Sequence, residues 1–513
     1  MVLGLFRMDI KLAGYNVDKN GLDEIARLLS GKRLSKKKKE QIFRILDNST
    51  PETISAAYAR ISRSEKPIAE LRKDATNDVK KARESNDNII FGIGHASIAE
   101  HAVFNFDIEG VSRRLVEDIE KQRLVSFTEK SQRYVTLDND FVIPNEIKNT
   151  PLESEFVKVI ELQNKFYHDN LGKITDFHKK IWEGSGKPAK TIKGYGKEDA
   201  RYGVSMATES SIGMTINARN IEKAITYLKG LGYDEAFELA QNFINETKGI
   251  APSLIKYVDA TDYDSKTRPN LRNYVAYLIQ DSDMNFTDYE FPVVSPFNID
   301  KSSDAIGAAL IFSSSNLSYE NSQELFKKLP VDEKLDLMHK VAHKYQESFD
   351  PKLREFELTG KNIFELDLSS SAFAQLKRHR IGATLISQKY NLNLGYTTPE
   401  SIKKTGLGTK LFDVVNLGSN FYNKLIQEGL SVPVAELILT NAHHRRVLFS
   451  ANPREMYAFA ALRLDEHAQW DIKDYAKEFD FFLKYNDKLT YAGLCGKDTF
   501  DEVKHNLDAS VNN

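Results

Sequence analysis

Residues 94–134 read GHASIAEHAVFNFDIEGVSRRLVEDIEKQRLVSFTEKSQRY and combine a strand pattern, a helix pattern and clusters of polar residues. Four polar residues open it and an apolar alternation follows: His95, Ser97, Glu100 and His101, then Val103, Phe104, Phe106 and Ile108. Alternation with a period of two predicts a strand. Ser112 comes next and can cap a helix. The apolar side chains of that helix would face inward: Leu115, Val116 and Ile119.

The predicted helix ends in Lys121-Gln122-Arg123, and further polar residues follow. Cations at a helix C-terminus stabilise the macrodipole, which is the simple structural interpretation. The functional alternative is an anionic ligand, because planar guanidinium groups bind phosphate oxygens in pairs. We favour the anionic ligand, because the polar residues that follow the helix could surround a nucleotide phosphate and base: Ser126, Glu129, Ser131 and Arg133.

Two pairs of short segments resemble each other in the same order along the chain. Lys121-Gln122-Arg123 with Ser131-Gln132-Arg133-Tyr134 matches Arg378-His379-Arg380 with Ser387-Gln388-Lys389-Tyr390, at an offset of about 257 residues. Asn217-Ala218-Arg219 matches Asn452-Pro453-Arg454, at an offset of about 235 residues. Coincidence among common residue types is the alternative to a diverged tandem duplication.

The second half repeats the theme of a capped helix that ends in cations. Ser369 to Ser371 predict a helix start, and the helix ends at Lys377-Arg378-His379-Arg380, which faces either solvent or an anion. Near the C-terminus, spacings of 3, 4, 4 and 3 predict one helical stripe of Met456, Phe459, Arg463, His467 and Trp470. Arg463 is then either a snorkelling side chain or a ligand-binding one. His443 and His444 are adjacent and cannot share a face, so we predict no metal site there.

Composition bounds the class of protein. The chain has 513 residues and a mass of 58.3 kDa, which allows two or three domains. Its 71 basic and 73 acidic residues leave a net charge of −2, which gives no electrostatic argument for nucleic acid or an anionic membrane. With one cysteine, Cys495, there is no intrachain disulfide and no cysteine-based zinc site. Without a long apolar run or a secretion signal, we expect a cytoplasmic protein.

The remaining segments suggest the domain boundaries. We expect a leader at 1–50, a first domain at 51–260, a linker at 261–300, a second domain at 301–490 and a tail at 491–513. The Lys36–Lys39 run reads as a solvated helix face rather than a phosphate site, because no aromatics interleave it. Local patterns predict a helix at 153–172, a loop or insertion at 173–200 and linker segments at 259–273 and 292–303.

These motifs closely resemble the flavin-dependent thymidylate synthases. That family has a His-x-Ser/Thr-x-x-Glu-His element, a strand, a Ser-Arg helix start, Arg-His-Arg, seven residues and Ser-x-Arg-Tyr. In this chain, Ala200-Arg201 precedes Asn217 as in the family, and Leu462-Arg463 with Asp465–Ile472 (DEHAQWDI) resembles the family's ending. The resemblance implies two diverged α+β domains in tandem, each with a sheet flanked by helices.

The resemblance also implies site residues. Catalytic residues would be Arg463 and Arg378. FAD would contact His95, Ser97, Glu100, Arg123, Asn217, Arg219, Arg378, His379, Arg380, Asn452 and Arg454. The substrate dUMP would contact Glu129, Ser131, Arg133, Arg201 and Arg463. No metal is implied.

Each copy departs from the family pattern in different places. The first copy has Lys121-Gln122 where the family has Arg-His. The family's late arginine falls at Leu228, or at Lys229 if the register shifts by one residue. The second copy keeps only Glu357 of the early element, and carries Glu436 opposite Arg201 and Lys389 opposite Arg133. Each copy therefore keeps what the other has lost.

The implied reaction is reductive methylation of dUMP to dTMP with methylenetetrahydrofolate and NADPH through FAD, without an enzyme nucleophile. Family members form sites where subunits of a tetramer meet, so a fused pair would form the same assembly as a homodimer. We expect no membrane and no nucleic-acid partner. The alternatives are a flavin enzyme acting on another uracil-containing substrate, a nucleotide- or flavin-binding relative without turnover, and a nucleic-acid binder using the Lys36 run, which the net charge disfavours.

Overall fold

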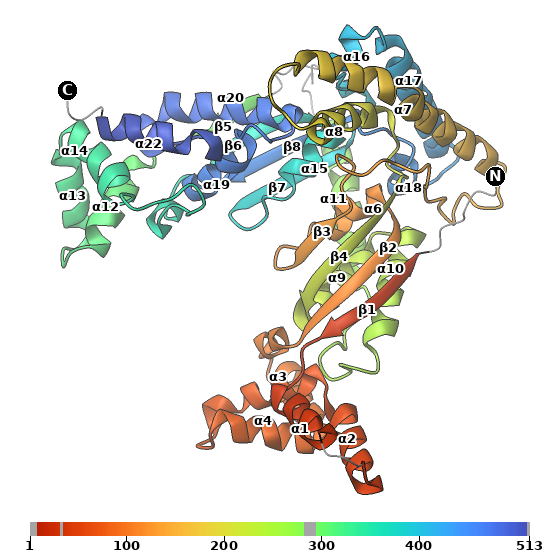
Figure 1. The fold of residues 1–513 in the computed structure, drawn as a ribbon, viewed down its shortest axis with the longest axis vertical. Helices are drawn as coiled ribbons and strands as arrows, with labels where there is room; N and C mark the ends of the chain where they lie inside the picture. Colours follow the sequence, from red (N-terminus) through yellow and green to blue (C-terminus); the bar gives the residue numbers. More distant parts are fainter. Residues whose placement is uncertain (1–7, 31–33, 282–293, 510–513) are drawn as a thin grey trace. The chain divides into compact units, whose positions relative to one another are not determined.

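The computed structural model describes residues 8–30, 34–281 and 294–509. They contain two four-stranded antiparallel sheets (Figure 1). The first has the order β1 (Asp9–Tyr15), β2 (Val103–Ser112), β4 (Glu209–Asn217), β3 (Ser126–Glu129). The second has the order β5 (Val294–Asn298), β6 (Asn362–Ser369), β8 (His444–Ala451), β7 (Ala383–Tyr390). The two orders are the same topology repeated, which confirms the predicted α+β fold in tandem.

Helices connect and flank the strands. In the first half they are α1 (Lys19–Leu29), α2 (Lys36–Asn48), α3 (Pro51–Ala59), α4 (Ile68–Asn77), α5 (Val79–Asn86), α6 (Arg113–Ile119), α7 (Glu153–Ile181), α8 (Ala189–Ala200), α9 (Ala218–Gly230), α10 (Asp234–Thr247) and α11 (Asp262–Gln280). In the second half they are α12 (Ser303–Ser313), α13 (Tyr319–Lys328), α14 (Val331–Leu335), α15 (Ser370–Leu376), α16 (Glu400–Lys404), α17 (Gly408–Gln427), α18 (Val432–Glu436), α19 (Pro453–Arg463), α20 (Trp470–Asn486), α21 (Lys488–Tyr491) and α22 (Phe500–Ala509). None of the helices in these described ranges is both long and apolar enough to cross a membrane.

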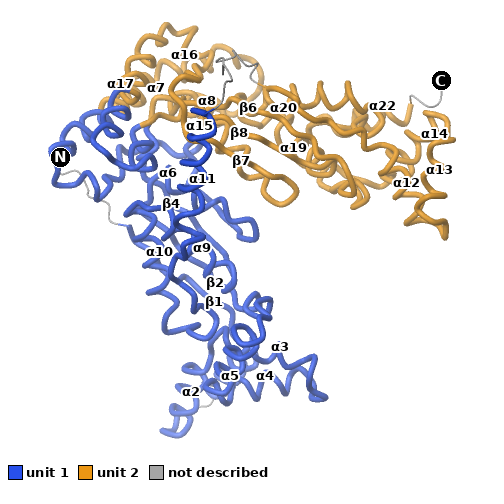
Figure 2. Tube along the Cα trace, turned by 180° about the vertical axis from the view of Figure 1, so that it is seen from behind, with its two compact units in different colours: residues 1–161, 205–286, 420–438 blue, residues 162–204, 287–419, 439–513 orange. Residues whose placement is uncertain are grey.

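The chain divides into two compact units that do not follow its halves (Figure 2). Unit 1 comprises residues 1–161, 205–286 and 420–438, and unit 2 comprises residues 162–204, 287–419 and 439–513. Each unit therefore contains one sheet and a segment from the other half of the chain. The compact units are defined by contacts in space and not by position in the sequence. The predicted boundaries of the two domains, 51–260 and 301–490, therefore stay a prediction about where the duplicated segments begin and end.

Matching backbone hydrogen bonds tie each exchanged segment into its unit. In unit 1 the Ala207 amide donates to the Leu437 carbonyl over 2.8 Å. In unit 2 the Ala442 amide donates to the Tyr202 carbonyl over 3.2 Å. Both pairs are related by the offset of 235 residues found in the sequence, with the roles of the two halves reversed. The exchange is thus reciprocal.

The core of each unit begins at its central strands. Along β2 the side chains of Phe104, Phe106 and Ile108 are buried while the residues between them are exposed, as the alternation predicted. In unit 2 the rings of Phe364, Phe449, Phe459 and Phe479 pack against one another with centroids 4.4 to 5.7 Å apart. The strand at 103–108 is confirmed.

The helix starts predicted at the two serine caps are also confirmed. The Ser112 hydroxyl accepts a hydrogen bond from the Leu115 amide, and the Ser369 hydroxyl accepts one from the Ala372 amide. Both serines are fully buried, so each cap also satisfies a polar group in the core.

The loop predicted at 173–200 is wrong for most of its length, and the alternative of an insertion stays a prediction. The helix predicted at 153–172 continues as α7 to Ile181, and α8 occupies Ala189–Ala200. Gly196 on α8 lies so close to α7 that a Cβ there would come within 2.2 Å of the Thr175 hydroxyl. Gly196 therefore permits close helix packing. Gly184 and Gly186, with φ of +75° and +72°, lie in the turn at 182–188 that joins the two helices.

Four other segments have a local structure that the sequence patterns did not predict. The polar stretch at 259–273 enters helix α11, since Thr261 and Asp264 form a capping box. The proposed C-terminal stripe is broken, because α19 ends at Arg463 and the Gln469 side chain caps the new helix α20. Residues 9–15, inside the expected leader, form an edge strand paired with β2. Within the expected linker 292–303, β5 covers Val294–Asn298, whereas Pro292 lies outside the described residues.

Candidate active site

The predicted site residues are divided between the two units. Unit 1 carries His95, Ser97, Glu100, Arg123, Glu129, Ser131, Arg133, Asn217 and Arg219. Unit 2 carries Arg201, Arg378, His379, Arg380, Asn452, Arg454 and Arg463. The exchange thus brings Arg201 of the first half into the unit that holds the arginine-rich turn of the second half.

The early polar element of unit 1 lies at a turn before β2. Gly94 has a φ of +88°, a conformation that favours glycine, and a short 3₁₀ helix follows at Ala96–His101. His95 and Ser97 are exposed there, while the half-buried Glu100 forms an ion pair with Arg219 at 2.5 Å. The two predicted flavin contacts Glu100 and Arg219 therefore hold each other.

The same ion pair exists in unit 2 between Glu357 and Arg454. Arg454 also donates from Nε to the Lys352 carbonyl over 2.7 Å. The asparagines before these arginines, Asn217 and Asn452, cap helices α9 and α19 by accepting from the amides of Asn220 and Glu455. This repeated cap and ion pair supports the duplication in side-chain detail and gives these residues a structural role.

In unit 2 the turn after α15 holds Arg463 in a fixed place. The Arg463 guanidinium donates to His379 Nε2 at 3.2 Å, to Gln375 Oε1 at 3.3 Å and to the Gln375 carbonyl at 2.9 Å. His379 Nδ1 in turn contacts Glu455 at 3.1 Å. Burial lowers the pKa of His379, so the ring is neutral and can accept from the arginine.

In unit 1 a charged cluster occupies the equivalent turn. Asp118 stands at the position of Gln375 and accepts from Lys121 and Arg114, both at 2.7 Å. The hydroxyls of Tyr227 and Tyr233 also donate to it, at 3.2 and 3.0 Å. Burial alone would raise the pKa of Asp118, but the charges of Arg114 and Lys121 outweigh it and hold the pKa well below its ordinary value. This turn is therefore closed by internal ion pairs.

Sequence reasoning missed the partners that orient these groups. Asp118, Gln375 and Glu455 lie within or beside the motifs described above, but none of them belongs to a motif. The offset of 257 residues, which relates Gln375 to Asp118, is the signal that could have shown the difference between the copies.

The remaining predicted substrate contacts of unit 1 lie on and just after β3. The buried Glu129 carboxylate lies 3.5 Å from the Arg113 guanidinium. The Ser131 hydroxyl accepts from the Arg133 amide over 3.2 Å, and Arg133 lies over the Tyr134 ring at 5.7 Å. Arg133 is half-buried, so its charge lies close to the surface of the unit.

The exchanged segments place opposite charges at equivalent positions. In unit 2, Arg201 is buried, and the Asn441 side chain donates to its backbone carbonyl over 3.1 Å. In unit 1, the equivalent residue Glu436 is buried and accepts from Arg114 over 2.6 Å. The unit that keeps Arg201 is thus the one whose turn keeps Arg378, His379 and Arg380.

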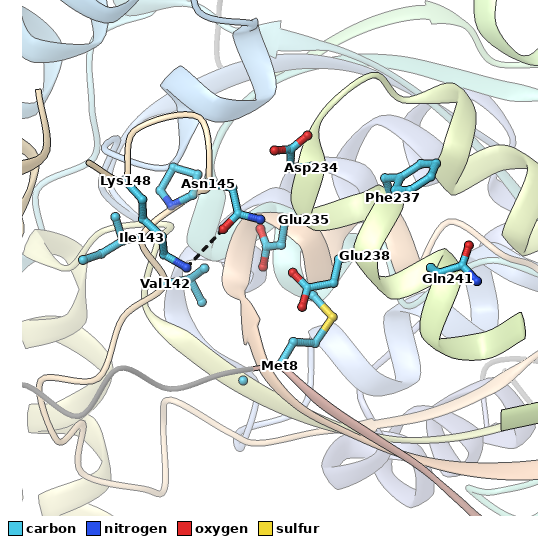
Figure 3. A pocket seen from close by; sticks show the side chains of 12 residues that line it. Met8, Val142, Ile143, Asn145, Lys148, Asp234, Glu235, Phe237, Glu238 and Gln241 are labelled. Carbon is cyan, nitrogen blue, oxygen red and sulfur yellow. Dashed lines mark hydrogen bonds between the residues drawn. The ribbon is translucent and has the colours of Figure 1, made fainter. Parts of the chain in front are cut away.

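A cavity of about 770 Å³ lies elsewhere in unit 1, between α10 and the segment 142–148 (Figure 3). Asp234, Glu235 and Glu238 face it from α10, and Lys148 donates to Asn145 on the other side over 3.2 Å. None of the predicted site residues lines this cavity. Burial raises the pKa of Glu235 to about 7, against the hydrogen bonds that it accepts from Ser112.

In the ranges that the structure describes, no group of three or more His, Cys, Asp or Glu side chains is arranged to hold a metal ion. His443 contacts Thr440 and Ser419, at 2.9 Å each, and His444 contacts Asp367 at 3.0 Å and Thr397 at 2.7 Å. The adjacent histidines therefore have different protein partners.

Comparison with known proteins identifies the family. The family model described as thymidylate synthase complementing protein matches residues 44–253 and 307–484. The flavin-dependent thymidylate synthase of Clostridium tetani is 33% identical over 211 residues, which cover 40% of this chain and 82% of that protein. That of Geobacter sulfurreducens is 29% identical over 215 residues, 40% of this chain and 81% of that protein.

Two further matches differ in what they cover. The UPF0159 protein Ta1429 of Thermoplasma acidophilum is 23% identical over 503 residues, 89% of this chain and 97% of that protein. Thymidylate synthase X of Helicobacter pylori, solved with FAD and dUMP, matches 49% of this chain and 98% of its own, with 15% identity and a TM-score of 0.29. The family model matches more than half of the residues, in two regions, and this chain therefore belongs to the family of flavin-dependent thymidylate synthases, with two copies of the family's domain in tandem.

Proposed function

We propose that this chain is an FAD-dependent thymidylate synthase that converts dUMP to dTMP, with methylenetetrahydrofolate as carbon donor and NADPH as reductant. The observation that carries the proposal is the Arg463 cluster of unit 2, in which neutral partners His379 and Gln375 hold a guanidinium by three hydrogen bonds. A guanidinium fixed in this way can stabilise negative charge that develops on a bound uracil ring.

The donor set of unit 2 fits an anionic dinucleotide cofactor. Arg378 is exposed and has no ion-pair partner among the described residues, so its planar donors are open to a phosphate. Gly382 follows in the same turn, and a Cβ there would come within 2.6 Å of the Glu455 carboxylate. We assign FAD to Arg378, His379, Arg380, Asn452 and Arg454 of this unit, and to His95, Ser97, Glu100, Arg123, Asn217 and Arg219 of unit 1.

FAD, when bound, supplies hydride chemistry that no protein side chain provides. The chain's own residues bind and orient the reactants. We assign dUMP to Glu129, Ser131, Arg133, Arg201 and Arg463, in which the arginines compensate the phosphate charge and Arg463 polarises the uracil. We assign Arg378 a catalytic role because it lies on the same turn as His379, the partner of Arg463.

Complementary loss is the argument for a shared site. The first copy keeps Ser131, Arg133 and Arg201 but carries Gln122 and Leu228, and the second keeps Arg463 and the Arg-His-Arg turn but carries Glu436 and Lys389. If each site uses groups from both copies, the assembly contains sites of two kinds. One kind can stay complete and keep the protein active while the other kind loses its groups. We therefore propose a homodimer of roughly 117 kDa, twice the chain mass of 58.3 kDa, in which four domains supply the sites.

The test combines three measurements on the purified full-length protein. Flavin absorbance after purification tests cofactor binding, light scattering tests the mass, and release of tritium from [5-³H]dUMP in the presence of methylenetetrahydrofolate and NADPH tests turnover. A yellow dimer that releases tritium supports the proposal. A yellow protein without tritium release points to another uracil-containing substrate or to a binding-only relative, and a colourless one contradicts the proposal. A stable monomer with FAD and turnover would contradict the dimer.

A further inference from the structure

Unit 2 contains a second cavity, of about 240 Å³, that none of the proposed site residues lines. Three segments enclose it: the loop 346–352, helix α19 and the segment 493–500 before α22. Its walls are largely apolar and aromatic: Phe349, Pro351, Tyr457, Ala458, Ala461, Leu462 and Phe500. An engineered apolar cavity of about 150 Å³ is large enough to bind benzene, so this one can hold a small ring compound.

Lys352 brings an amine to this cavity. Its side chain is almost fully buried, with 6% of the residue exposed. Nζ donates to the neutral amide oxygen of Gln346 over 3.1 Å and lies 4.6 Å from the centre of the Tyr457 ring. Within the described part of the chain, no carboxylate lies at ion-pair distance from it. A buried lysine without a counter-charge is costly as an ammonium ion and is stable as a free amine.

The ionisable groups closest to Lys352 are uncharged, and Asp350, which lines the cavity, is not within ion-pair distance of Nζ. His339 donates from Nε2 to the Leu489 carbonyl over 2.7 Å, and His343 donates from Nδ1 to the Met338 carbonyl over 2.8 Å. Burial lowers the pKa of His339 to about 3 and that of His343 to about 4, so both rings are neutral. Burial also raises the pKa of Cys495, which keeps its thiol protonated at neutral pH.

These surroundings change the protonation of Lys352. Burial lowers the pKa of Lys352 to about 7, with Cys495 opposing and the charge of Lys504 on α22 adding to the shift. About half of the molecules would then carry a free amine at pH 7, compared with about one in 2,500 for an exposed lysine with an ordinary pKa near 10.4. A desolvated lysine amine in an apolar pocket is the usual nucleophile for carbonyl compounds.

We propose that this cavity is a second binding site, in which Lys352 forms an imine with a small aromatic or apolar aldehyde. The amine nitrogen attacks the carbonyl carbon, a C–N bond forms, and the carbonyl oxygen takes a proton to give a carbinolamine. Loss of water then leaves the C=N double bond, with both amine protons and the carbonyl oxygen departing as that water. No oxidant or reductant is required. The aromatic wall formed by Phe349, Tyr457 and Phe500 favours a flat apolar body on the aldehyde.

The test uses benzaldehyde as the probe and sodium cyanoborohydride to trap the imine on the full-length protein. Peptide mass spectrometry then measures the label on each lysine between pH 6 and pH 9. We expect Lys352 to be labelled at least about 100-fold faster than exposed lysines at pH 7, because of its larger fraction of free amine. Its rate should rise steeply through pH 7 and level off above it, whereas the rates of exposed lysines should continue to rise.

Two variants sharpen the result. Lys352→Arg keeps the charge but cannot form an imine, and should abolish the fast label. Lys497→Arg changes another lysine that lines the same cavity and should leave the fast label unchanged. Labelling of Lys352 at the rate of exposed lysines in the folded wild-type protein would overturn the proposal, whether or not the variants fold. A fast label that maps to Lys497 would overturn it as well.

Discussion

The turn after α6 in unit 1 and the turn after α15 in unit 2 have the same backbone topology but opposite chemistry. In unit 2 a neutral glutamine, Gln375, and a neutral histidine hold the Arg463 guanidinium. In unit 1 the equivalent of Gln375 is Asp118, and Leu228 is buried where the arginine would be. The buried carboxylate takes its own cations from Arg114 and Lys121. One duplicate thus holds a cation between neutral partners, and the other has an internal ion-pair cluster at the equivalent turn.

The exchanged segments show the same contrast. In unit 1, Glu436 is paired with Arg114. In unit 2, Arg201 stands at the position of Glu436, and Ser371 stands at the position of Arg114. Arg114 is buried and its charge is balanced by Glu436 and Asp118, so it is a weaker phosphate ligand than an unpaired arginine at the surface. If unit 2 carries the working groups, as proposed, a duplicated site can lose its ligand chemistry while its fold is kept, because intramolecular contacts replace the lost ones.

The largest effect is expected from Arg463→Ala. If Arg463 polarises the uracil, its loss should lower kcat/KM for dTMP formation by about 1,000-fold or more. Tritium release from dUMP measures this, with circular dichroism as the check on folding. Arg272→Ala, on the exposed helix α11, removes the same charge far from the proposed residues in sequence and should leave the rate within about twofold. An Arg463→Ala protein with near wild-type turnover would remove Arg463 from the site.

Arg133→Ala should have a comparable effect if the two copies share a site. Its duplicate in the second copy is Lys389, which lacks the planar pair of donors. We expect a loss of activity of at least about 100-fold, mainly through a higher KM for dUMP. Arg133→Lys should recover part of it. Activity that is insensitive to Arg133 would mean that complementary loss does not describe the working site.

A stability experiment compares the two copies directly. Arg114→Ala leaves Asp118 and Glu436 buried with fewer partners, and should destabilise unit 1 by about 3–5 kcal/mol. Ser371→Ala, at the equivalent position of unit 2, removes only a hydroxyl and should cost less than about 1 kcal/mol. Urea unfolding followed by circular dichroism measures both. Equal costs would contradict the view that unit 1 replaced a ligand site with an ion-pair cluster.

The sequence predicted those parts of the fold that follow from local patterns. Ser112 and Ser369 as caps, the alternation along β2 and the two copies were all readable, because each depends on short-range spacing. The exchange of residues 162–204 and 420–438 was not, since it depends on which partner a helix finds over a long range. The helices within 173–200 were missed because Gly196 serves close packing against Thr175.

The candidate site was readable only to the level of residue type. Arg463 stood out as a charge in an apolar stretch, but its partners Gln375 and His379 lie more than 80 residues away in sequence. The ion pair between Glu100 and Arg219, and the caps formed by Asn217 and Asn452, show that some residues assigned to the flavin also stabilise the fold. Spacing alone cannot separate the two roles, because both require a polar side chain at the end of a strand.

A smaller effect is expected on cofactor binding. The double variant Arg378→Ala/Arg380→Ala should fold normally but lose most of its bound flavin, because the turn then lacks guanidinium donors for a phosphate. The ratio of flavin absorbance to protein absorbance measures the loss, for which we expect at least about tenfold. Lys403→Ala/Lys404→Ala removes two exposed cations of the same unit from α16 and should keep the flavin. Full flavin content in the arginine variant would exclude this turn as the flavin contact.

The smallest effect concerns the pH dependence of stability in unit 1, through Glu235. Its pKa is raised by burial to about 7 in the folded protein, above the ordinary value near 4.5. The folded state therefore holds the proton more tightly, so this stabilising contribution is complete below pH 4.5 and is lost as the pH rises through 7. Glu235→Gln cannot ionise and keeps a group that can accept from the Ser112 amide. From pH 5 to pH 8 the free energy of unfolding of the variant should rise by about 1–3 kcal/mol relative to that of the wild type, measured by urea unfolding at both pH values.

The control is Glu238→Gln, which removes the carboxylate of a half-buried residue that lines the same cavity. If Glu235→Gln and the wild type respond identically to pH, Glu235 is ionised throughout and the Ser112 hydrogen bonds outweigh its burial.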